Sequence, residues 1–337
     1  MREGGKRASR CASRSSVVAL LSACYRPHPS LLGWNSRSFE RCTAAPTDPA
    51  RRCLVTDTWT PTRVRELESL LTERDGHILE DLERFRALST RLIQRLHFPA
   101  GLHGLHATVP TATRLANRVL LRLEAHGLIA RIDRRVGGAL RGSAATTWHL
   151  AATGERLLRA RRGESGRRRY VTPSRDFLAH TLAVAEFAGA TKESELRGEI
   201  DVLELDTEPS CWRPFHGPVG VVTLKPDLFT VVANADVEAH VFVEIDRGTE
   251  HLPAVIKKCR TYQQYRQTGL AQASSGVFPA VLWVTPDAER ARKLRTAIRR
   301  EPDLPADLFT ICEEAEALTA LTVFLAPSPT SRKEVSS

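Results

Sequence analysis

The stretch of sequence that decides the fold is KPDLFTVVANADVEAHVFVEIDRGTE, residues 225–250. Two β-prone runs, residues 219–232 and 237–245, flank the turn-forming residues 234–236 (Asn-Ala-Asp). A turn of this kind between two apolar runs predicts an antiparallel hairpin. The midpoint of the turn, between residues 235 and 236, sets which residues of the two strands lie opposite each other.

The predicted hairpin brings acidic side chains together. Its register places Asp227 opposite Glu244, and the two-residue period of a strand puts Asp246 on the same face as Glu244. Carboxylates this close repel one another, and a divalent cation such as Mg²⁺ or Mn²⁺ would neutralise them. We therefore expect Asp227 and Glu244 to be metal ligands, with Asp246 beside them. An ion pair of Arg247 with Glu250 or Glu244 would neutralise the cluster without a metal, and this alternative stays open.

Helical and strand patterns continue on both sides of the hairpin. Helices are predicted at residues 176–188, 249–268 and 287–299, and further strands at residues 199–205, 280–285 and 308–312. The resulting order is αβββαβαβ. It predicts a mixed α/β sheet in which the hairpin is antiparallel and a helical crossover leads to parallel strands.

The N-terminal half has a different pattern. Apolar residues at helical spacing predict a helix at residues 73–85, a short second helix after the N-cap Ser89, and a third at residues 111–126. Two β-prone runs follow at residues 128–133 and 146–150, with glycines between them. Three helices followed by a glycine-rich hairpin are typical of a winged helix-turn-helix domain.

The charge distribution indicates that this domain binds a polyanion. Residues 61–170 carry 21 Lys and Arg against 11 Asp and Glu, whereas residues 171–337 carry 18 against 24. Arginine contacts the phosphates and guanine edges of double-stranded DNA, which is the partner that we expect. The candidate contacts on the third helix and in the hairpin are Arg114, Asn117, Arg118, Arg122, Arg131, Arg134, Arg135 and Arg141. Winged helices also dock on proteins, and the arginines would then only make the surface soluble.

The ends of the chain follow neither pattern. The expected divisions are a basic tail or mis-assigned start (1–55), a winged helix domain (72–160), a basic linker (161–174), a sheet domain (175–325) and a C-terminal tail (326–337). Residues 21–24 (Leu-Ser-Ala-Cys) are similar to a bacterial lipoprotein cleavage box, which would make the chain an exported lipoprotein lipidated at Cys24. Against this, the apolar run before Cys24 is at the minimum length, and the basic module that follows would meet no polyanion outside the cell. The isolated cysteines favour a cytoplasmic protein, and no run approaches the roughly 20 apolar residues of a membrane span, so no membrane partner is expected.

The acidic residues carry a resemblance to a known group of enzymes. Pro226-Asp227 followed by Glu244-Ile245-Asp246 resembles the Pro-Asp and acid-x-Lys signature of the PD-(D/E)XK, or restriction-endonuclease-like, nuclease superfamily, and the predicted element order is similar to that superfamily's core. Together with the winged helix, residues 225–229, 242–250 and Lys258-x-x-x-Tyr262 are similar to the replication-relaxation family of bacterial plasmids and integrative elements. The resemblance covers residues from about 72 to 325.

The resemblance implies a metal-dependent site with one departure. In the superfamily the aspartate and glutamate bind the metal, and a lysine two residues later activates water, but Asp246 stands in the place of that lysine. Lys258 on the next helix could take over this role. Lys258 and Tyr262 are at positions i and i+4, so they share one face of the helix and could both reach over the acids. Lys225 is a second candidate, and Glu186 has the place of a further acid. The candidate catalytic residues are Asp227, Glu244, Asp246, Lys258 and Tyr262.

These observations lead to three hypotheses. The leading one is a DNA-binding protein of a mobile element that acts in plasmid replication or DNA relaxation, with metal-dependent phosphodiester cleavage if the site is active. The second is a catalytically inactive, nuclease-like DNA-binding regulator. The third is the exported lipoprotein. Plasmid replication or transfer proteins and a second copy of the chain are candidate partners.

Overall fold

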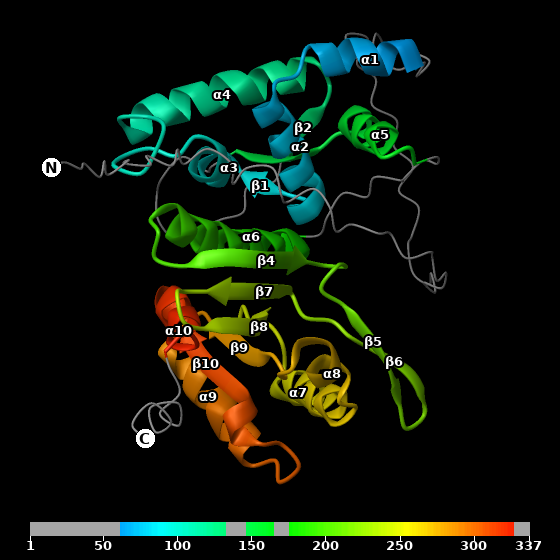
Figure 1. Cartoon of the computed structure of the whole chain (residues 1–337), viewed down its shortest axis with the longest axis vertical. Helices are drawn as coiled ribbons and strands as arrows, with labels where there is room; N and C mark the ends of the chain where they lie inside the picture. Colours follow the sequence, from blue (N-terminus) through cyan, green and yellow to red (C-terminus); the bar gives the residue numbers. More distant parts are fainter. Residues whose placement is uncertain (1–60, 133–145, 165–174, 327–337) are drawn as a thin grey trace, which may run out of the picture. The chain divides into compact units, whose positions relative to one another are not determined.

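A computed structural model describes residues 61–132, 146–164 and 175–326, shown with helix and strand labels in Figure 1. The expected start or tail at 1–55, the cleavage box ending at Cys24, residues 165–174 of the expected linker and the tail from 327 onward lie outside the described residues. In the part of the chain that is described, no helix has both the length and the apolar character needed to cross a membrane.

The first predicted helix has the bounds that its pattern indicates. Helix α2 spans Glu73–Phe85. Thr72 begins it with a capping box, because the Thr72 hydroxyl accepts from the backbone N–H of Asp75 and the Asp75 carboxylate accepts from the backbone N–H of Thr72 at 2.8 Å. A helix that was not predicted, α1 (Pro61–Ser69), precedes it and has few apolar residues.

The next two helices also begin at capping residues. Helix α3 (Thr90–His97) follows Ser89, whose hydroxyl accepts from the backbone N–H of Leu92 at 3.1 Å, as predicted. Helix α4 spans Val109–Ala125 and starts two residues before the predicted position, because Thr108 caps it and a proline occupies its first turn. Gly127 adopts a φ of 67° just after α4, which is the left-handed conformation of a glycine that ends a helix.

A small three-stranded sheet follows α4. Strands β2 (Ile129–Ile132) and β3 (Thr147–Leu150) are antiparallel, which confirms the pairing of the predicted hairpin. The two-residue strand β1 (Leu88–Ser89) pairs with the other edge of β3, so that the order is β1-β3-β2. Helix α5 (Ala152–Arg161), which was not predicted, comes directly after β3.

The larger sheet has the strand order β10-β9-β8-β7-β4. Strands β4 (Asp201–Thr207), β7 (Leu228–Ala233) and β8 (Glu238–Ile245) are antiparallel to one another in turn, and β9 (Ala280–Thr285) and β10 (Phe309–Glu313) continue the sheet parallel to β8. Helices α7 (Leu252–Gln267) and α9 (Ala288–Arg299) form the crossovers. The predicted mixed α/β sheet is therefore confirmed, and β9 has the predicted bounds.

The prediction of one continuous strand over residues 219–232 is wrong. The run forms β6 (Gly220–Leu224), which pairs with β5 (Arg213–Gly217) in a separate hairpin, and then β7. Pro226 separates them, because proline has no N–H to continue a ladder. Helix α6 (Arg175–Leu196) runs past its predicted end at 188, and the short helices α8 (Leu270–Ser275) and α10 (Ala317–Val323) were not predicted.

The side chains on the two faces of the larger sheet belong to two separate buried hydrophobic clusters. On one face, Val243 and Ile245 pack with apolar residues of α6 and α10, and this cluster includes the buried residues of α2, α3 and α4. On the other face, Phe242 and Trp283 pack with α7 and α9. Because α6 and α7 cover opposite faces, side chains from the two helices can meet only beyond the ends of the strands.

Candidate functional site

The register of the larger sheet brings Asp227 and Glu244 together. Strands β7 and β8 pair as the turn predicted, with Leu228 opposite Val243, and Asp227 and Glu244 are the next residues along this ladder. Both carboxylates are buried, with 7% and 1% of the residue exposed. The backbone N–H of Ile245 donates to Oδ2 of Asp227 at 2.7 Å, which holds that carboxylate against the end of β8.

Helix α7 places a lysine and a tyrosine over these two acids. The Lys258 ammonium donates to Oε2 of Glu244 and lies 3.7 Å from Oδ1 of Asp227. One turn later, the Tyr262 hydroxyl donates to Oε1 of Glu244 at 2.5 Å. Lys258 and Tyr262 therefore both reach Glu244 from one face of α7, as their spacing predicts.

A histidine that the sequence analysis did not single out completes the group. Nε2 of His180, on α6, lies 3.3 Å from Oδ1 of Asp227. The sequence offers no signal for this contact, because His180 is a single histidine in a helix 47 residues before Asp227. Only the packing of α6 against the sheet edge makes it a neighbour.

Burial and the neighbouring charges determine the protonation of the group. Burial and the nearby Asp227 charge raise the pKa of Glu244 to about 8, although the bonds from Lys258 and Tyr262 oppose the rise. Burial opposes the charge on Lys258, but the two acids together raise its pKa. Burial also opposes ionisation of Asp227, and the charges of Lys258 and His180 more than offset it, so that the Asp227 pKa is lowered. The hydrogen bond to Asp227 raises the pKa of His180.

Asp246 lines the same cavity as Asp227 and Glu244, but other groups bind its carboxylate. Nε of Arg290, on α9, donates to Oδ2 of Asp246 at 2.6 Å, and the backbone N–H of Gly248 donates to Oδ1 at 2.7 Å. The strand period placed Asp246 on the correct side of the sheet, but β8 has ended at Ile245 and a partner on α9 holds the side chain. Arg247, the neutralising residue considered above, is exposed and forms no ion pair with any described residue.

The arrangement of donors around the two acids does not fit a divalent cation. Each oxygen of Asp227 and Glu244 already faces a donor or a positively charged group, and the Lys258 ammonium lies where an ion bridging the two carboxylates would have to lie. Among the residues described, no three His, Cys, Asp or Glu side chains are placed to hold a metal together. A metal ion would need Lys258 to leave this position.

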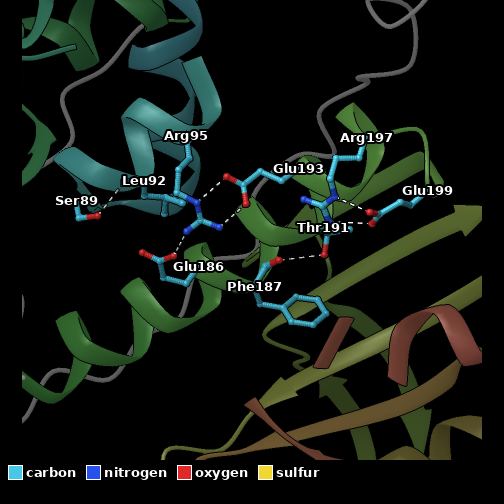
Figure 2. A network of polar contacts seen from close by, with 9 residues as sticks. All are labelled: Ser89, Leu92, Arg95, Glu186, Phe187, Thr191, Glu193, Arg197 and Glu199. Carbon is cyan, nitrogen blue, oxygen red and sulfur yellow. Dashed lines mark hydrogen bonds and ion pairs between the residues drawn. The ribbon is translucent and has the colours of Figure 1, made fainter. Parts of the chain in front are cut away.

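The group opens into a cavity of about 680 Å³ at this edge of the sheet. Lys225 also lines the cavity, but its ammonium lies 4.3 Å from the centre of the Trp212 ring and forms no ion pair with a described residue. Glu186 lies elsewhere, and it accepts from Arg95 of α3, which also binds Glu193 (Figure 2). Lys258 is therefore the cation that the acids share, and Glu186 is not a further acid of this site.

The residues proposed for DNA contact fall into three groups. Arg114, Asn117 and Arg118 are exposed on α4, on the side opposite the buried Ala112 and Ala116, and form no ion pair with a described residue. This agrees with an outward-facing surface. Three hairpin residues, Arg134, Arg135 and Arg141, lie outside the described residues.

Two of the proposed arginines are held by other side chains. Nη2 of Arg122 donates to both oxygens of the buried Asp75, at 2.6 and 2.5 Å. Nη2 of Arg131 donates to Glu124 at 2.7 Å, and its guanidinium lies 5.1 Å from the centre of the Trp148 ring. The outer surface of α4 that remains free to contact a polyanion therefore consists of Arg114, Asn117 and Arg118, and we call it the α4 face.

Comparison with known proteins gives one match. Neither the curated proteins nor the solved structures contain a significant match to this chain. The family model described as replication-relaxation matches residues 79–281, a range that begins in α2 and ends in β9 and so includes the α4 face and the Asp227–Glu244 pair. Because this match spans more than half of the chain, the protein belongs to the replication-relaxation family.

Proposed function

We propose that this protein binds double-stranded DNA through the α4 face and acts in plasmid replication or DNA relaxation without cleaving the DNA. The family to which it belongs indicates the process. The DNA-binding role and the absence of cleavage are our inferences from the contacts described above.

The observation that carries the proposal is the α4 face itself. Arg114, Asn117 and Arg118 lie at positions i, i+3 and i+4, so their side chains are neighbours on one side of the helix. The opposite side of α4 is buried through Ala112, Ala116, Leu120 and Leu123. A helix anchored in this way presents guanidinium and amide groups in a fixed geometry, which suits contacts to phosphates and base edges.

The acid group supports a binding protein over a nuclease. Lys258 neutralises Asp227 and Glu244 from within the protein, and Asp246, which stands where the superfamily has its lysine, is paired with Arg290. Metal-dependent phosphodiester cleavage is the alternative, favoured by the convergence of two buried acids beside an open cavity. Supercoiled plasmid incubated with the protein and Mg²⁺ should stay supercoiled; nicking that Asp227→Ala abolishes would support the alternative.

Fluorescence anisotropy with labelled duplex DNA tests the binding role. Each arginine that contacts a phosphate contributes about one unit to the slope of log K against log salt. The variant Arg114→Ala/Arg118→Ala should therefore bind on the order of tenfold or more weakly at low salt and lower the slope by about 2. The matched control is Arg292→Ala/Arg300→Ala, which removes two exposed arginines, one within α9 and one just after its end. An equal loss in both double variants, or no DNA binding by the native protein at low salt, would contradict the proposal.

A further inference from the structure

The Asp227–Glu244 pair requires a cation, and the chain supplies one. Two buried carboxyl groups side by side can both ionise only where a positive charge compensates them. The Lys258 ammonium reaches both acids. No other Lys or Arg among the described residues forms an ion pair with either acid.

The position of Lys258 is fixed by the helix that carries it. Val255, Ile256, Cys259 and Tyr262 of α7 are buried in the cluster on the same face of the sheet. Tyr262 donates to Glu244, the carboxylate that Lys258 also binds. The backbone of α7 therefore cannot move away without exposing this cluster, and the ammonium stays within reach of the acids.

We infer that the Lys258 ammonium is the resident cation of this pocket and occupies the place of a divalent metal ion, so that a metal binds Asp227 and Glu244 only when Lys258 is removed. A tethered ammonium competes as a ligand present at a local concentration on the order of millimolar or above. A divalent ion placed beside it would also be repelled across a partly dehydrated pocket. Both effects act against metal binding in the native protein. This inference concerns the acid pocket alone and does not depend on DNA binding by the α4 face.

Replacing Lys258 should create the missing metal site. Lys258→Met keeps the apolar stem of the side chain and removes the charge. The two acids then lack a cation, and Mg²⁺ or Mn²⁺ can be held by as few as one or two carboxylates together with water. Mn²⁺ serves as the probe, because its binding is measured directly from the loss of the free-ion electron paramagnetic resonance signal.

The experiment titrates the full chain with Mn²⁺ at pH 8 in the absence of DNA. In the native protein we expect no saturable Mn²⁺ site that depends on Asp227. In Lys258→Met we expect one such site, with an affinity for Mn²⁺ on the order of 100-fold higher than any Mn²⁺ binding by the native protein. The site should disappear again in Lys258→Met/Asp227→Asn. Lys257→Met, which removes the neighbouring exposed lysine, is the matched control and should behave like the native protein.

Two results would overturn the inference. One is an Mn²⁺ site in the native protein that is lost in Asp227→Asn, since Lys258 would then not exclude the metal. The other is a folded Lys258→Met variant, verified by circular dichroism, that binds no more Mn²⁺ than the native protein. If Lys258→Met does not fold, Lys258→Gln replaces it, and the native titration with its Asp227→Asn comparison still decides the first point.

Discussion

Arg122 and Arg118, both on α4, allow a role in folding to be distinguished from a role in DNA binding. Its guanidinium binds Asp75 of α2, whereas Arg118, one turn earlier on α4, is exposed and forms no ion pair with the described residues. We therefore expect Arg122→Ala to lower the free energy of unfolding and Arg118→Ala to leave it nearly unchanged. For DNA affinity we expect the reverse.

The magnitude follows from the burial of the two partners. Asp75 has 1% of its side chain exposed and Arg122 has 43%. A hydrogen bond to a charged group contributes about 1.5–3 kcal/mol, whereas a solvent-exposed ion pair contributes about 0–1 kcal/mol. Because only one partner is buried, we expect Arg122→Ala to lower the free energy of unfolding by about 1–2 kcal/mol. Asp75 remains in its capping box after this change, which limits the loss.

Urea denaturation followed by circular dichroism measures the effect through a double-mutant cycle. Arg122→Ala, Asp75→Asn and the double variant give the coupling energy of the pair, which we expect to be about 1 kcal/mol or more. Arg118→Ala is the matched control on the same helix. DNA binding by the same four proteins is then measured under conditions in which all are folded.

Two results would refute this reasoning. A coupling energy between Asp75 and Arg122 below about 0.3 kcal/mol would mean that the short contacts do not stabilise the fold, because sites that do not interact are additive to about that level. A loss of DNA affinity in Arg122→Ala as large as that in Arg118→Ala, with unchanged stability, would indicate that Arg122 contacts DNA.

Two further changes test the acid pocket and the contact between α3 and α6. Because burial raises the pKa of Glu244 from 4.5 to about 8, the folded state holds a proton that the unfolded state releases, so this stabilising contribution is present below about pH 4.5 and lost as pH rises through 8. Glu244→Gln should thus become progressively more stable relative to the native protein between pH 5 and pH 9 in urea denaturation, and a constant difference would contradict the assignment. Arg95→Met removes the bonds to Glu186 and Glu193 (Figure 2) and should lower the free energy of unfolding by about 1–2 kcal/mol. The control Lys192→Met breaks an ion pair within α6 and should lower it by less than about 0.5 kcal/mol. Equal losses in the two variants would mean that the contact between α3 and α6 adds no stability.

Local signals in the sequence were sufficient to predict the bounds or the register of several elements. The bounds of α2 follow from Thr72, Asp75 and apolar residues at helical spacing, all within one short segment. The register of β7 and β8 follows from the three-residue turn between them and from the two-residue strand period. These features depend on residues close in the chain, whose interactions do not require knowledge of the rest of the fold.

Elements without a strong local pattern were missed. Helix α1 has a mostly polar sequence, and its existence depends on neighbours that its own residues do not identify. The strand predicted over residues 219–232 is apolar on both sides of Lys225-Pro226-Asp227, and the prediction gave Pro226 too little weight as a break between β6 and β7. Pattern alone did not distinguish one long strand from two short ones that join different sheets.

The sequence by itself determined the mixed α/β class, the placement of Asp227 beside Glu244 and the shared face of Lys258 and Tyr262, because hairpin register and helix periodicity are local geometric rules. Only the tertiary structure decided which charged groups became partners. His180 reaches Asp227, Arg290 holds Asp246 and Arg122 holds Asp75 across separations of 44 to 47 residues. Several cations in the chain compete for each buried carboxylate, and burial makes the choice costly to change, so the partner is determined by how α4, α6 and α9 pack and not by spacing along the chain.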